Sequence, residues 1–150
     1  MAHRGCEMDN RFEAINLFSE EFTKMKDRDT VKIFGRNYEL CGFLEKLDEY
    51  LIIFNKHRMF EGFCFTNKFG NIEKHNANGW FDEYFASDKS MIKYGKSGEY
   101  KGYYVAENNC INEFDDRGSY KGYFRKEKNG SVNKYDSMGH FELALEKEAS

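Results

Sequence analysis

The 150-residue chain contains no proline, so no strand edge is blocked by a residue that lacks a backbone N–H group. It also lacks an apolar run of the length that a signal peptide or a membrane span needs, and its opening residues 1–7 are mostly polar. From these absences we expect a cytoplasmic protein without a membrane segment.

Cysteine is sparse, and no two cysteines have Cys-x-x-Cys spacing. The four are Cys6, Cys41, Cys64 and Cys110. This arrangement predicts neither a zinc site nor a dense disulfide framework. An even number leaves disulfides open, but we expect buried free thiols.

Recognisable catalytic motifs are absent as well. There is no G-x-S-x-G, no phosphate-binding glycine loop and no H-E-x-x-H, and the four histidines are scattered. No candidate nucleophile stands beside a base. We therefore predict a protein that is not an enzyme, with no catalytic residue, no metal ligands and no cofactor. The formal charge of −3 argues against a nucleic-acid binder, which is usually basic.

What the chain has in abundance is aromatic residues and a repeat. Aromatic residues make up 17% of the chain, which is typical of strands rather than of disorder. Between Ile72 and Leu145 a unit of about 20 residues is written four times. The same position in each unit is a turn glycine: Gly79, Gly98, Gly118 and Gly139.

Each unit reads as a β-hairpin with a three-residue loop. In Phe114-Asp115-Asp116-Arg117-Gly118-Ser119-Tyr120, the first aspartate can accept backbone N–H groups, and the glycine supplies a positive φ in a G1 bulge. This loop predicts four cross-strand ring pairs, namely His75–Phe81, Tyr94–Tyr100, Phe114–Tyr120 and Tyr135–Phe141. It predicts charged pairs on the next rung: Lys74–Asp82, Lys93–Lys101, Glu113–Lys121 and Lys134–Glu142.

The fold class that follows is mainly β (α+β) in a single domain of residues 1–150. We expect a loose lead (1–9), a helix (10–28), irregular hairpins (31–71), four hairpin repeats (72–145) and a tail (146–150). Phe12, Ile15, Phe18 and Phe22 recur at helical spacing, and Asn10 with Glu13 fits a capping box. The helix should close an antiparallel meander of tandem hairpins, curled into a half-barrel or open barrel.

Alternation along the strands then assigns faces. We expect the rings Tyr100, Tyr104, Tyr120 and Phe124 to share a concave face with the glycines between them, and Tyr84, Tyr103 and Tyr123 to lie on the opposite face.

Residues 92–145 resemble two known hairpin repeats. Tyr135-Asp136-Ser137-Met138-Gly139-His140-Phe141 is similar to the tyrosine-aspartate repeat of Rhs and teneurin shells. The segments 98–104 and 118–124 look like the core of a MORN repeat, a family that builds protein- and lipid-binding scaffolds. Neither resemblance assigns a functional residue.

The favoured function is a non-catalytic protein-binding domain, with the character of a bacterial toxin-immunity protein that neutralises a partner such as a basic toxin domain. This interpretation rests on small size, acidic charge and the lack of catalytic motifs. The expected partner-binding residues are Trp80, Asp82, Glu83, Tyr84, Tyr103, Asp115, Asp116 and Tyr123.

Two alternatives stay open. A half-barrel could hold a small apolar or aromatic ligand with Tyr100, Tyr104, Tyr120 and Phe124, or the repeats could form a scaffold. A filled interior would favour the protein-binding function, and an open pocket lined by those rings would favour the ligand-binding one.

Overall fold

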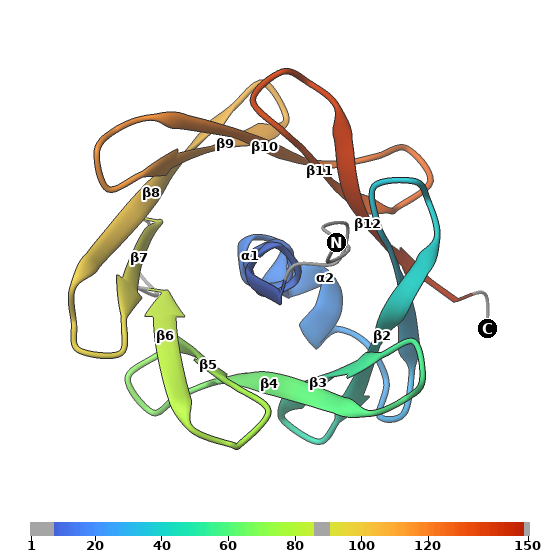
Figure 1. Ribbon diagram of the computed structural model, residues 1–150. Coiled ribbons are helices and arrows are strands. Elements are labelled where there is room, and N and C mark those ends of the chain that lie inside the picture. Colours follow the sequence, from blue (N-terminus) through green and yellow to red (C-terminus); the bar gives the residue numbers. More distant parts are fainter. Residues whose placement is uncertain (1–7, 86–90, 149–150) are drawn as a thin grey trace.

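The computed structural model describes residues 8–85 and 91–148, which form a ring of strands around a central helical segment (Figure 1). The helices are α1 (Met8–Leu17) and α2 (Ser19–Thr23). The strands are β1 (Thr30–Phe34), β2 (Leu40–Leu47), β3 (Tyr50–Asn55), β4 (Phe60–Thr66), β5 (Ile72–His75), β6 (Phe81–Phe85), β7 (Ile92–Gly95), β8 (Tyr100–Glu107), β9 (Cys110–Asp115), β10 (Tyr120–Lys126), β11 (Val132–Tyr135) and β12 (Phe141–Lys147).

The strands form a closed antiparallel barrel. Each strand pairs with its neighbour in sequence, and β1 pairs with β12 from Val31 opposite Lys147 to Phe34 opposite Ala144. The predicted antiparallel meander is confirmed, but the expected half-barrel or open barrel is wrong. Closure leaves neither end of the meander as a free edge.

At one end of the barrel the hairpin turn occurs six times, in the four predicted repeats and in two earlier hairpins. In all six, the first turn residue exchanges backbone hydrogen bonds with the fourth and fifth. The turns are 35–39, 55–59, 76–80, 95–99, 115–119 and 136–140. In the first two, Tyr38 (φ 58°) and Arg58 (φ 63°) occupy the place of the turn glycine. These six turns lie at one end of the barrel, which we call the six-turn rim.

A carboxylate or amide oxygen fastens each of these turns. Asp115 Oδ1 accepts the N–H groups of Arg117 and Ser119, both at 2.9 Å. In the turn that begins with Gly95, the first residue has no side chain that can accept a hydrogen bond. The fifth residue replaces it, because Glu99 Oε1 accepts the N–H of Ser97 at 3.0 Å. Glycine followed four residues later by glutamate is thus an alternative to an initial Asp or Asn.

The four predicted ring pairs are confirmed, and a bulge follows each one. Because the bulge adds one residue, the predicted charged rungs are displaced, and Lys74 lies opposite Glu83 rather than Asp82. The bulge residue still reaches the interior, so Lys134 Nζ lies 2.8 Å from Glu142 Oε1 and the predicted contact forms without the predicted register.

Because of the bulge, two of the four rings that we expected on the concave face lie on the outer face of the barrel. Tyr104 and Phe124 point into the barrel, where they are 4% and 0% exposed. Tyr100 and Tyr120 lie on the outer face of the barrel, where they are 44% and 40% exposed. The prediction of one concave ring face is therefore wrong, because simple alternation fails where two residues oppose one.

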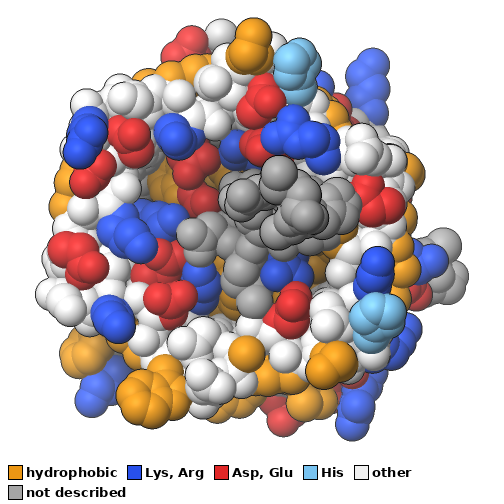
Figure 2. Space-filling model, viewed as in Figure 1, with side chains coloured by type: hydrophobic (Ala, Val, Ile, Leu, Met, Phe, Trp, Pro, Cys, Tyr) orange, Lys and Arg blue, Asp and Glu red, His pale blue; other side chains and the backbone are white. Residues whose placement is uncertain are grey.

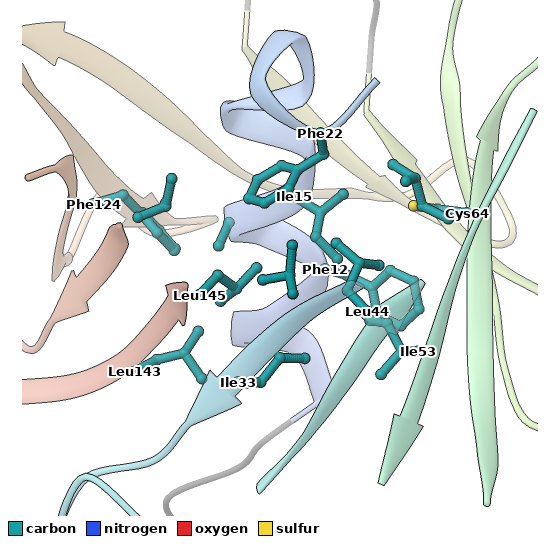
Figure 3. Packing of buried hydrophobic residues seen from close by; sticks show 14 of the residues in the cluster. Phe12, Ile15, Phe22, Ile33, Leu44, Ile53, Cys64, Phe124, Leu143 and Leu145 are labelled. Carbon is teal, nitrogen blue, oxygen red and sulfur yellow. The ribbon is translucent and has the colours of Figure 1, made fainter. Parts of the chain in front are cut away.

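Helix α1 fills the centre of the barrel. Its residues 11–16 are all buried, as is typical of a helix surrounded on every side. Phe12 and Ile15 pack with α2 and with strands at the start and end of the chain, among residues labelled in Figure 3: Phe22, Ile33, Leu44, Ile53, Cys64, Phe124, Leu143 and Leu145.

The helical segment differs from the prediction. The helix expected over 10–28 breaks at Phe18 (φ −117°, ψ 37°) and ends at Thr23. Asn10 lies inside α1, so it is not the N-cap, and Glu13 points to the barrel wall instead of capping. Most of the expected lead, residues 1–7, lies outside the described residues.

The cysteines behave differently from one another. Cys64 and Cys110 are free thiols, and burial raises the pKa of Cys64 to about 12. Cys41 is disulfide-bonded, so the expectation of free thiols is wrong there. Cys6 lies outside the described residues. No helix in the described part of the chain is long and apolar enough to cross a membrane.

Candidate functional site

The six-turn rim exposes an apolar side chain in or beside every turn. Trp80 is 73% exposed and Met138 is 79% exposed. The full set, which we call the rim residues, is Tyr38, Met59, Phe60, Trp80, Tyr100, Tyr120 and Met138. Each of the six turns therefore places at least one exposed apolar side chain at this end of the barrel.

The structure divides the predicted partner-binding residues into four groups, of which the stacked tyrosines are described separately below. Trp80 and Asp116 are exposed at the six-turn rim, and Asp82 is partly exposed beside it. Asp115 fastens its own turn, and the backbone N–H groups that it accepts, that of Ser119 foremost, lower its pKa. Glu83 is 1% exposed inside the barrel, so its assignment to a partner surface is wrong.

The three predicted tyrosines of the outer face are part of ring stacks. Tyr84 stacks on Tyr94 with centroids 5.1 Å apart, and Tyr103 stacks on Phe114 at 4.9 Å. Tyr123 stacks on Tyr135 at 4.9 Å. All are half-buried because neighbouring rings on adjacent strands cover their faces. They support the barrel wall more than they offer free contact area.

The interior of the barrel has an apolar part and a charged part. The difference follows from one inward-pointing position of the hairpin repeat. The position five residues before the turn glycine, or its equivalent, always points inward. In chain order it holds Ile33, Ile53, Lys74, Lys93, Glu113 and Lys134. The first two copies extend the apolar core, and the last four bring charges into the barrel.

Glu83 is the centre of the charges on one side. Its carboxylate lies 3.2 Å from Lys74 Nζ, 3.7 Å from Lys93 Nζ and 3.3 Å from Lys101 Nζ. Lys93 and Lys101, which were predicted to face each other as two like charges, both pair with this one carboxylate. A buried charge is tolerable when it is paired in this way.

Glu13 of α1 brings a second carboxyl group into the barrel. Tyr104 hydrogen-bonds to Glu13 Oε2, and the Glu113 carboxylate is close enough to interact electrostatically with Glu13. Burial, reinforced by the Glu113 carboxylate, raises the pKa of Glu13 well above its usual value.

A cavity of about 460 Å³ lies between α1 and the strands β7–β12. Charged and hydroxyl-bearing side chains dominate its lining, among them Glu13, Lys93, Lys101, Tyr104, Glu113, Tyr120, Lys121, Lys134, Ser137 and Glu142. Acidic and basic side chains gather around a hollow within the ring of strands in Figure 2. Of the four predicted ligand-binding rings, only Tyr104 and Tyr120 line it.

Most residues of this cavity were not predicted from the sequence as site residues. Glu13 was assigned to a cap and the charged rungs were treated as cross-strand pairs without a buried role. The signal that could have found them is the inward position itself, which is apolar in Ile33 and Ile53 and charged in the later copies. No group of histidine, cysteine, aspartate or glutamate that could hold a metal ion occurs within residues 8–85 and 91–148.

The fold and its two sites define a helix-filled barrel of tandem hairpins. No family model matches the chain, and no curated protein or solved structure shows a significant similarity to it. Function must therefore be argued from the six-turn rim and from the cavity.

Proposed function

We propose that the protein is a non-catalytic binding domain that covers a protein partner with its six-turn rim. The observation that carries this proposal is the exposed apolar side chain at every turn of that rim. In its specific form the proposal is that of a cytoplasmic immunity or inhibitor protein, which neutralises a toxin by occupying the toxin's working surface.

The rim suits binding because its backbone is already ordered. Each turn is fastened by two backbone hydrogen bonds and joined to a closed barrel, so association would order little more than side chains. Trp80 and the tyrosines Tyr38, Tyr100 and Tyr120 offer large contact areas with few rotatable bonds. Residues of these types are enriched among interface positions that dominate affinity.

Carboxylates that could contact a basic partner lie at the rim among basic side chains of the same turns, such as Arg36, Lys96 and Arg117. Asp116 is exposed, and Asp82 remains partly exposed although it lies 3.3 Å from Lys74 Nζ. Carboxylates at the edge of an interface accelerate association with a basic protein and contribute less to the lifetime of the complex. A toxin domain that binds nucleic acid would be basic in this way.

The alternative of an apolar or aromatic ligand has less support. The apolar part of the barrel is filled by Phe12, Ile15 and Phe22. The cavity that remains is lined mainly by charged groups, which an apolar molecule would have to desolvate without compensation.

The test compares two aromatic residues at opposite ends of the barrel. Trp80 is 73% exposed on the six-turn rim, and Phe69, in the turn between β4 and β5 at the other end, is 74% exposed. Partners captured from the native host's lysate are identified, and their affinity for Trp80→Ala and Phe69→Ala variants is measured. We expect Trp80→Ala to weaken the complex by about 2 kcal/mol or more and Phe69→Ala to leave it unchanged. Equal effects, or a stronger effect of Phe69→Ala, would reject the rim as the binding surface.

A further inference from the structure

We propose that the cavity is a second binding site, for a small organic anion whose carboxylate or phosphate group lies between Lys101 and Lys121. This site adjoins the protein-binding surface proposed above, because Tyr120 and Ser137 of the six-turn rim line it.

The two lysines are equivalent residues of adjacent hairpins. Each is the third residue after a turn glycine, Gly98 or Gly118, and therefore occupies the bulge position that reaches the interior. Strand β9 lies between their strands β8 and β10, and both side chains line the cavity. The repeat thus places two ammonium groups on one wall of the cavity.

At the same position in the flanking repeats, carboxylates replace the lysines and are paired with buried lysines. Asp82 lies 3.3 Å from Lys74 Nζ, and Glu142 lies 2.8 Å from Lys134 Nζ. Only the fourth and fifth repeats carry a lysine at this position, so positive charge is concentrated there.

The protein neutralises these two lysines incompletely. The Lys101 side chain is 41% exposed and contacts Glu83, a carboxylate that also serves Lys74 and Lys93. Lys121 is exposed and forms no ion pair within 4 Å among the described residues, and the carboxylate near enough to interact with it is that of Asp115. A lysine ammonium is a strong hydrogen-bond donor to carboxylate and phosphate oxygens. A bound anion could therefore accept hydrogen bonds from both lysines.

The rest of the cavity selects for a polar ligand. Its volume of about 460 Å³ is within the range of small-molecule sites. Tyr120 and Ser137 also line it, together with acidic residues that include Glu113, Asp136 and Glu142. These groups suit a molecule with hydroxyl or amino groups beside its anionic group, and they disfavour an alkyl chain.

The experiment titrates ¹⁵N-labelled protein with two probes at constant ionic strength, inorganic phosphate and L-glutamate, and follows amide shifts by NMR. Saturable shifts at residues around the cavity are expected for one or both probes, and the stronger probe identifies the anionic group. The variants are Lys121→Gln, Lys101→Gln and, as a matched control, Lys96→Gln. Lys96 is an exposed lysine of the same rim that does not line the cavity.

We expect Lys121→Gln and Lys101→Gln each to weaken binding by about tenfold or more, and Lys96→Gln to leave it unchanged. Lys121→Gln is the decisive variant, because Lys101 also contacts buried Glu83 and its loss can disturb the wall. No saturable shift with either probe up to 20 mM (on the order of the weakest useful affinities), or equal weakening by Lys96→Gln, overturns the proposal.

Discussion

The carbonyl oxygen of Tyr135 lies where a side chain on Gly122 would begin. A Cβ atom added to Gly122 would be 2.1 Å from this oxygen, and Gly122 has a φ of 115°. The same relationship joins Gly102 to the carbonyl of Phe114, at 2.4 Å. In these two hairpins, the glycine after the bulge therefore permits the neighbouring hairpin's backbone to approach, which explains the glycine between the two rings of each strand.

Gly122→Ala should destabilise the fold by about 3 kcal/mol, because the new methyl group meets backbone and the φ is unfavourable. Gly118→Ala is the matched control: its φ is 82°, but a Cβ there meets nothing within 4 Å. We expect it to lose only about 1–2 kcal/mol. Urea unfolding of both variants measures the difference. Equal losses would show that φ alone, not the close approach, demands glycine at position 122.

The local sequence pattern predicted the hairpins of residues 72–145, but it did not predict that the strands close into a barrel. The loop chemistry of Asp115 and Gly118 determines its own register, so the ring pairs could be derived from adjacent residues. The first two repeats escaped notice because Tyr38 and Arg58 adopt the positive φ that usually indicates glycine. Pairing of β1 with β12 joins the two ends of the barrel, and no local spacing specifies it.

The site was harder to predict because a single bulge residue changes which side chains of a strand point into the barrel. Counting alternate residues from Tyr100 places Tyr104 beside it, whereas the bulge at Lys101 puts the two rings on opposite faces. Glu83 was assigned to the surface because it was interpreted with Asp82 as an acidic turn, whereas it lies within β6 and is buried. The cavity additionally needs α1 inside the barrel, and a short helix with Glu13 and Arg11 among its buried residues does not predict that placement.

The raised pKa of Glu13 makes stability depend on pH. Between the unfolded-state value, near ~4.3, and the higher folded-state value, the native protein binds more protons than the unfolded chain. The free energy of unfolding should therefore fall as pH rises through this window. Glu13→Gln mimics the protonated acid, with an amide that can bond to Tyr104 and Glu113, and should remove this fall.

The measurement is urea unfolding of wild type and Glu13→Gln from pH 5 to pH 8. The variant should gain stability over wild type as pH increases. Glu113→Gln serves as a second probe, because it removes the neighbouring carboxylate that contributes to the shift. Parallel stability curves for wild type and Glu13→Gln would show that Glu13 does not titrate in this range.

The last prediction concerns steering at the six-turn rim. If the partner is basic, reversing exposed Asp116 with Asp116→Lys should slow association several-fold at low salt and leave dissociation nearly unchanged. Trp80→Ala should act in the opposite way, on dissociation, because it removes contact area and no charge. Glu83 is unsuitable for reversal, since a lysine there would be buried beside Lys74, Lys93 and Lys101.

The control for steering is Glu107→Lys, which makes the same change of charge at the other end of the barrel, where β8 turns into β9. Association rates of wild type and both variants are measured from 20 to 500 mM salt, a range over which screening shortens from about 20 Å to about 4 Å. The rates for Asp116→Lys and wild type should converge at high salt. A larger effect of Glu107→Lys would place the binding surface at the opposite end, and faster association of Asp116→Lys would mean that the partner is acidic.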